Sequence, residues 1–207
     1  FYFIFLLICF QGFIGWYMVK SGLVDRIDVS HFRLSVHLLI AFVILSLIFW
    51  NYLKIRKKND ISLKISPIFP IIFLILVFIQ IGIGAFVSGM DAGKIYNTWP
   101  LMGNTYFPDD NKFVNLFRLS ALSDPSLIQF VHRNLAYIIG IFYLFLLYKI
   151  YRNKLNDLYP SINLLGFFIF LQIILGIFTI IYGAQILIAS MHQISSIFLV
   201  SSSVYFV

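Results

Sequence analysis

Long apolar runs separated by short polar segments make up most of this chain. The runs cover residues 1–19, 34–53, 67–88, 127–148, 162–182 and 186–207. Each is close to the roughly 20 residues that a helix needs to cross the hydrocarbon core of a bilayer. Backbone exposed to lipid must satisfy its own hydrogen bonds, as helices do. The pattern therefore predicts an all-α polytopic transmembrane bundle with six helices.

The residues between the runs support these boundaries. Asp124 followed by Pro125 is typical of an N-cap and the first turn of a helix. Pro67 and Pro70 fall where the third helix should begin. Residues 182–185 predict a tight turn between the last two helices.

Composition and charge fit a membrane protein. The chain is 61% hydrophobic and 11% charged, whereas soluble domains carry roughly 25% charged residues. The net charge of +7 lies mostly in connections, so lipid headgroups explain it better than nucleic acid does. The connections after the second and fourth runs hold Lys54, Arg56, Lys57, Lys58, Lys64, Lys149, Arg152 and Lys154, which the positive-inside rule places in the cytoplasm or a mitochondrial matrix.

An internal repeat combines a glutamine, a glycine and a histidine. Gln-x-x-x-Gly occurs at Gln11 and Gly15, at Gln80 and Gly84, and at Gln172 and Gly176. The helix that follows each pair carries one histidine, namely His37, His132 and His192. The repeating unit is thus a helical hairpin, and such units commonly build a shared core.

The repeat places the histidines at similar depth, about 10 Å into their spans from one side. One intramembrane histidine is as often a structural hydrogen-bonding residue as a functional one, but histidines at matched depth on alternate helices favour a cofactor site. Zinc would require more ligands, and the single Cys9 and the absence of acids in the spans argue against it. Two imidazoles on facing helices suit the axial positions of a haem. We expect His132 and His192 to form a complete pair in residues 67–207, and His37 to be half of a second metal site.

Several residues keep two interpretations. The glycines alone more often mark close helix packing. Arg33 and Arg133 are candidates to pair with haem propionates or with lipid phosphates. Trp99 and Tyr96 are interfacial anchors or a roof over the site, and His31 is expected to be a solvated loop residue.

The central motif resembles a known family. Residues 84–93 (GAFVSGMDAG) and 96–103 (YNTWPLMG) are similar to the signature of the haem A synthases, and so are matching positions in residues 11–23, 29–37, 129–137 and 192–193. The form without loop cysteines resembles the alphaproteobacterial and mitochondrial branch.

The resemblance implies eight helices in two pseudo-symmetric four-helix halves, of which the sequence given holds six. Residues 1–66 would be the remaining helix pair of the substrate half plus a cytoplasmic loop, and residues 67–207 the half that binds haem b. It implies oxidation of a methyl group of haem O to the formyl group of haem A, for cytochrome oxidase. His132, His192 and Arg133 would bind haem b, and His37 and Arg33 the substrate haem.

The sequence departs from the family at its start. The family's first two helices, with a further histidine and a glutamate linked to catalysis, are missing, and the chain contains no glutamate. We therefore read it as part of a longer protein, inactive by itself, whose catalytic residue is unknown. The site would face the outside of a bacterial inner membrane, or of the mitochondrial inner membrane. Haem O synthase, cytochrome oxidase assembly factors and a second copy of the chain are candidate partners.

Two other functions compete with this interpretation. A membrane b-type cytochrome would only pass electrons, but it would usually place its haems at different depths, whereas these histidines share one level. A transporter would fit the internal repeat, yet transporters more often have helices broken at the midplane. The matched depth favours the oxidoreductase.

Overall fold

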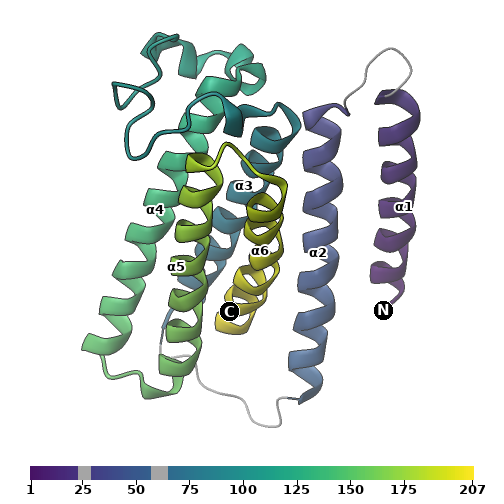
Figure 1. The fold of residues 1–207 in the computed structure, drawn as a ribbon. Helices are drawn as coiled ribbons and strands as arrows, with labels where there is room; N and C mark the ends of the chain where they lie inside the picture. Colours follow the sequence, from purple (N-terminus) through teal and green to yellow (C-terminus); the bar gives the residue numbers. More distant parts are fainter. Residues whose placement is uncertain (23–28, 57–64) are drawn as a thin grey trace.

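The computed structural model describes residues 1–22, 29–56 and 65–207, and in these residues the apolar runs form six α-helices (Figure 1). Each is long and apolar enough to cross a membrane, so the predicted all-α, multi-pass membrane fold is confirmed. The helices are α1 (Tyr2–Gly22), α2 (His31–Arg56), α3 (Ile68–Gly89), α4 (Pro125–Arg152), α5 (Tyr159–Ile181) and α6 (Ile186–Phe206). Short 3-10 helices lie in the connections, namely η1 (Ala92–Lys94), η2 (Phe113–Phe117), η3 (Leu119–Ser123) and η4 (Asn156–Leu158).

The helix ends follow the signals in the sequence. The Asp124 carboxylate accepts a hydrogen bond from the Leu127 amide at 3.1 Å, and Pro125 opens α4 as predicted. The turn between α5 and α6 uses positive φ angles of 65° at Gly183 and 56° at Ala184. Helix α4 continues to Arg152, beyond the apolar run, because charged side chains at a helix end can reach the headgroup region.

The ends of the bundle differ in charge. Lys54 and Arg56 end α2, and Lys149 and Arg152 end α4, at the end of the bundle opposite the long connection between α3 and α4. We call the end that carries this connection the loop end. Lys57, Lys58 and Lys64, which contribute to the predicted charge bias, lie outside the described residues. The orientation in the membrane stays a prediction.

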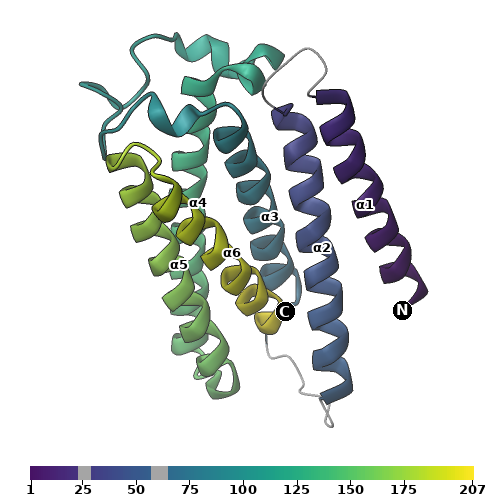
Figure 2. The ribbon, with the colours of Figure 1, turned by 45° about the vertical axis from the view of Figure 1, so that its right-hand side comes forward.

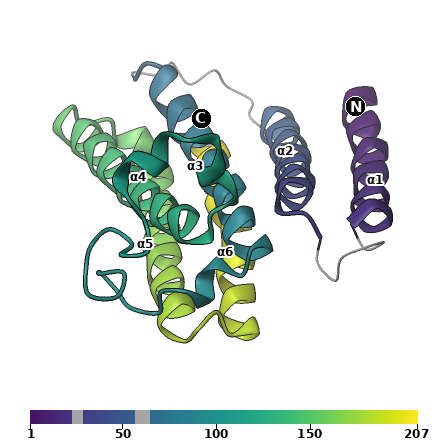
Figure 3. The same ribbon diagram turned by 90° about the horizontal axis from the view of Figure 1, so that it is seen from above.

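Helices α3 to α6 form a bundle, α2 packs on α3 and α6, and α1 packs on α2 (Figures 1 and 2). Viewed from the loop end, α1 and α2 stand beside the bundle, with α1 outermost (Figure 3). Helices α2 and α3 approach closely, since the Ser35 hydroxyl donates to the Gly82 carbonyl at 3.0 Å. A Cβ at Gly89 would lie 2.8 Å from the Cβ of His31. The division of the chain at residues 66 and 67 stays a prediction.

The main buried apolar cluster lies toward the end opposite the loop end. Phe73, Leu146, Ile150, Ile162 and Leu165 are fully buried there. The histidines of the repeat lie in the other half of the helices, nearer the loop end. The fold thus places the main buried apolar cluster in one half of the bundle and the glutamine–histidine pairs in the other.

Candidate functional site

The glutamine of each repeat is hydrogen-bonded to its histidine. The side-chain Nε2 of Gln11 donates to the backbone carbonyl of His37 at 3.0 Å. Gln80 donates to His132 and Gln172 to His192 in the same way, each at 3.0 Å. The hairpin repeat found in the sequence is therefore a repeat of contacts, in which an amide on one helix fixes the depth of the histidine on the next.

The surroundings of the imidazole differ in the last repeat. The Nε2 atoms of Gln11 and Gln80 lie 3.3 Å from the Nε2 atoms of His37 and His132. Gln172 instead donates to the Ser195 hydroxyl at 2.8 Å, and that hydroxyl donates to the His192 carbonyl at 2.9 Å. Sequence reasoning did not single out Ser195, although its position one helical turn after His192 was a usable signal.

The glycine of each repeat makes room for the histidine ring. A Cβ at Gly15, Gly84 or Gly176 would lie 3.0, 3.1 or 3.2 Å from Cε1 of the paired imidazole. Gly12 and Gly140 have no such neighbour within 4 Å. The atoms nearest to each repeat glycine thus belong to the imidazole of the paired histidine, which favours accommodation of the ring over plain helix packing.

The imidazoles keep a nitrogen available to a ligand. The Nδ1 atoms of His37, His132 and His192 are buried and have no hydrogen-bond partner among the described residues. A buried polar atom without a partner is costly, so these atoms fit a group that binds between the helices. The described residues contain no group of three or more His, Cys, Asp or Glu side chains placed to hold a metal ion. Two imidazoles, from α4 and α6, could serve as the axial ligands of a haem, and this assignment stays a prediction.

Arg133 is bonded to the loop that follows α3. Its guanidinium donates to the carbonyls of Tyr96 at 2.8 Å, Thr98 at 2.9 Å and Leu101 at 3.3 Å, and the residue is only 6% exposed. Among its nitrogens, Nε has no partner in the described chain. Pairing of Arg133 with a propionate stays a prediction. The hydrogen bonds show that Arg133 also holds the loop in place.

Other side chains hold the same loop. Gln129 donates to the Tyr96 carbonyl at 3.0 Å, the Trp99 indole donates to the Tyr137 hydroxyl at 3.0 Å, and Asn97 donates to the Ile180 carbonyl at 2.9 Å. The loop therefore packs on α4 and α5, and both interpretations of Trp99 and Tyr96, as interfacial anchors or as a roof over the site, stay predictions.

The Tyr96 side chain anchors the loop on its outer side. Its hydroxyl donates to Asp109 at 2.5 Å. Partial burial, together with this hydrogen bond, raises the pKa of Tyr96 to about 12. The hydroxyl consequently remains protonated, and a donor, throughout the physiological pH range.

We predict that Arg133→Met in the whole protein detaches the loop. The variant loses three hydrogen bonds from a charged donor and leaves carbonyls without partners, each bond contributing about 1.5–3 kcal/mol. Amide exchange in residues 94–101 should accelerate by about tenfold or more, because local opening becomes easier. The matched control is Arg152→Met, whose guanidinium donates to the Tyr148 hydroxyl at the opposite end of α4. Equal amide exchange in the Arg133→Met and Arg152→Met variants would contradict the role of Arg133 in holding the loop.

Arg33 lies at the loop end of α2, one helical turn before His37. Its guanidinium carbon is 5.0 Å from the centre of the Tyr17 ring. Its Nη1 atom is buried without a hydrogen-bond partner among the described residues. Arg33 thus keeps a donor for an anionic group one helical turn from His37.

The prediction for His31 is wrong. It is the first residue of α2 and is half-buried, and its ring centre lies 4.3 Å from that of Phe32 and 5.2 Å from that of Phe86. The helix begins earlier than the apolar run because residues 31–33 continue it into the interface. His31 lies at the crossing of α2 and α3 and outside the glutamine–histidine pairs.

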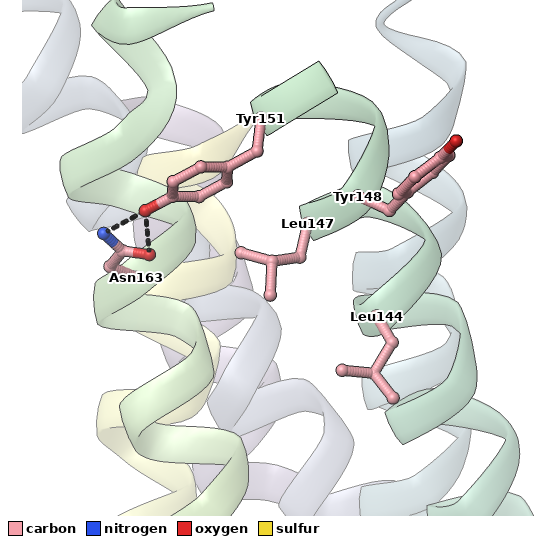
Figure 4. Close-up of a pocket in the computed structure, with 5 residues that line it drawn as sticks. All are labelled: Leu144, Leu147, Tyr148, Tyr151 and Asn163. Atoms are coloured by element: carbon pink, nitrogen blue, oxygen red, sulfur yellow. Dashed lines mark hydrogen bonds between the residues drawn. The ribbon is translucent and has the colours of Figure 1, made fainter. Parts of the chain in front are cut away.

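A pocket between α4 and α5 is remote from the histidines. It has a volume of about 360 Å³ and is lined by Leu144, Leu147, Tyr148, Tyr151 and Asn163 (Figure 4). The side chains of Tyr151 and Asn163 are hydrogen-bonded to each other. The Tyr151 hydroxyl oxygen lies 3.1 Å from Oδ1 and 2.9 Å from Nδ2 of Asn163. Because these residues lie near the end opposite the loop end and already have partners, we do not assign this pocket to the site.

Comparison with known proteins gives consistent similarities. Residues 1–204 match the family described as cytochrome oxidase assembly protein (COX15-CtaA). The chain is 46% identical over 202 residues to a protein of Pelagibacter ubique named heme A synthase, covering 98% of this chain and 60% of that protein. It is 42% identical to the heme A synthases of Rickettsia felis and Rickettsia bellii, over 205 and 206 residues, covering 95% of this chain and 59% and 60% of theirs. The chain thus spans about three fifths of the length of these relatives.

Proposed function

The chain belongs to the cytochrome oxidase assembly protein (COX15-CtaA) family, and from this premise we propose that the whole protein is a haem A synthase. It would be a membrane oxidoreductase that converts a methyl group of haem O to the formyl group of haem A. The observation that carries the proposal is the recurrence of one contact set, in which a glutamine, a glycine and a histidine lie together in each hairpin.

The α3–α6 bundle supplies a complete histidine pair. His132 and His192 would hold haem b, which would supply a redox centre for electron transfer. Gln80 and Gln172 fix the backbone of these histidines, and Gly84 and Gly176 accept the edges of their rings. The loop held by Arg133 would cover this pair and limit the access of water from the loop end.

Helices α1 and α2 supply one histidine toward the substrate. His37 has the same contacts as His132, so it would act as one ligand of the substrate haem. Arg33, with its buried Nη1 lacking a partner, would bind a propionate. The chain contains no glutamate and spans three fifths of its relatives, so the catalytic residue is not assigned to any position in it.

The membrane and partners follow from the same proposal. The protein would lie in a bacterial inner membrane, or in the mitochondrial inner membrane, with the loop end facing outward. Haem O would be its substrate, and haem O synthase, cytochrome oxidase assembly factors and a second copy of the chain are candidate partners.

The test is to extract and identify the haems bound to the whole protein. We expect haem B together with haem O or haem A, because the resident and substrate sites use separate histidines. Acid–acetone extraction followed by chromatography and mass spectrometry distinguishes these haems. Haem B alone would favour a b-type cytochrome that only passes electrons, and the absence of any haem would exclude both functions.

A further inference from the structure

A groove between α2 and α6 lies beside the histidines and plays no part in the site described above. Its volume is about 540 Å³, within the roughly 300–1,000 Å³ of small-molecule sites. From α2 it is lined by Leu38, Ala41 and Leu45, and from α6 by Ser190, Gln193 and Ile197. It therefore lies between the helix of His37 and the helix of His192.

The sequence positions of the lining residues give the groove a direction. Leu38 follows His37 directly, and Gln193 follows His192. From Leu38 to Leu45 the groove extends about 10 Å along α2, at 1.5 Å per residue. It thus begins at the depth of the imidazoles and continues toward the middle of the membrane.

The two ends of the groove differ in polarity. Ser190 and Gln193 are exposed on α6, although α6 spans the membrane, and neither side chain hydrogen-bonds to the described part of the chain. An exposed amide facing lipid is unfavourable and marks function in membrane helices. The remaining lining residues are mostly aliphatic. The groove accordingly fits a ligand with a hydroxyl group at the histidine end and a hydrocarbon chain beyond it.

We propose that this groove binds the isoprenoid tail of the haem substrate, with Gln193 hydrogen-bonded to the hydroxyl at the base of the tail. The inference rests on the proposed function, since haem O carries such a hydroxyalkyl isoprenoid substituent whereas protohaem has only a vinyl group there. With its propionates toward Arg33 at the loop end, the ring on His37 would direct the tail away from that end. The groove would then select tailed haem over protohaem.

The experiment compares haem O with protohaem, because the two share a ring and differ in the tail. Whole protein is titrated with each haem, and binding at the substrate site is followed by absorbance. Ala41→Phe fills the groove and should weaken haem O binding by about tenfold or more, since the added ring takes the space of the tail. Protohaem binding should not change.

The control is Val43→Phe on the opposite side of α2. Val43 is 37% exposed, and Phe198, which has the equivalent position after His192, is 51% exposed. A large side chain is therefore tolerated at this position of the repeat. Val43→Phe should leave the affinities for both haems unchanged.

A second variant tests the polar end without adding volume. Gln193→Leu should weaken haem O binding by about five- to tenfold, the loss of one hydrogen bond, and should leave protohaem binding unchanged. This variant decides the question if Ala41→Phe does not fold.

The outcomes separate this inference from the proposed function. If the unchanged protein converts haem O but the groove variants show no selective loss of haem O affinity, the proposed function stands and the role proposed for the groove is wrong. Equal weakening for both haems would also overturn it, as would a co-purified quinone that is lost in Ala41→Phe while haem O affinity stays the same. Unchanged protein that binds haem O no better than protohaem and does not convert it would overturn both proposals.

Discussion

Whole protein carrying His132→Ala or His192→Ala should lose the haem of the α3–α6 bundle. Each change removes one of the two imidazoles proposed as axial ligands, and alanine leaves nothing in its place. Even groups that only support a metal ligand change affinity by about 10–100-fold, so loss of a ligand should cost at least that factor. The measurement is the haem-to-protein ratio, together with the absorption spectrum of the reduced protein.

His31→Ala is the control for the histidine variants. This change also removes an imidazole, but His31 lies at the crossing of α2 and α3, against Phe32 and Phe86. We expect its haem content and spectrum to match those of the unchanged protein. An unaltered spectrum in either His132→Ala or His192→Ala would show that the assigned ligand is wrong.

Much of the fold could be predicted from the sequence because the bilayer imposes a simple rule. A run of about 20 apolar residues has few alternatives to a spanning helix, and the Asp124-Pro125 and 182–185 signals marked the ends correctly. The helix ends at His31 and Arg152 lie beyond the predicted apolar runs, since these polar residues extend the helices into the interface. Hydropathy alone does not record where a helix continues beyond the apolar region.

The candidate site was predicted in part. The Gln-x-x-x-Gly and histidine spacing indicated which residues belong together, and the structure brings Gln80 and His132 into contact. The role of Gly84 could not be read from spacing, because it depends on the rotamer of His132 and on the distance between α3 and α4. The partners of Arg133 are backbone carbonyls, which every residue has, so no sequence pattern distinguishes them.

Gly84→Ala in the whole protein should weaken haem binding by about ten- to a hundredfold. The added methyl group would lie 3.1 Å from Cε1 of His132, so the ring has to move, and overpacking of this kind costs about 1–3 kcal/mol. Because a ligand to a haem iron tolerates little displacement, the cost should appear as lower haem affinity and a shifted spectrum. Haem titration of the apoprotein measures the first, and absorbance of the bound form measures the second.

Gly140→Ala is the matched control. It adds the same methyl group to a glycine on α4 that has no neighbour within 4 Å. Both changes raise the intrinsic preference for helix in the same way, so that contribution cancels in the comparison. Gly140→Ala should bind haem as the unchanged protein does, and equal affinities in the two variants would contradict the role assigned to Gly84.

Coupling between Gly84 and His132 distinguishes ring accommodation from helix packing. If the methyl group acts through the imidazole, Gly84→Ala should destabilise the haem-free protein when His132 is present and have little effect in a His132→Ala background. Residues in contact typically show coupling energies of about 0.5–3 kcal/mol, which thermal unfolding of the four haem-free proteins in detergent can resolve. If Gly84 instead serves to pack α3 against the backbone of a neighbouring helix, Gly84→Ala should lower the stability of the haem-free protein equally with and without His132. Since Gly15 and Gly176 have the same relation to His37 and His192, a coupling found at Gly84 should recur in each hairpin.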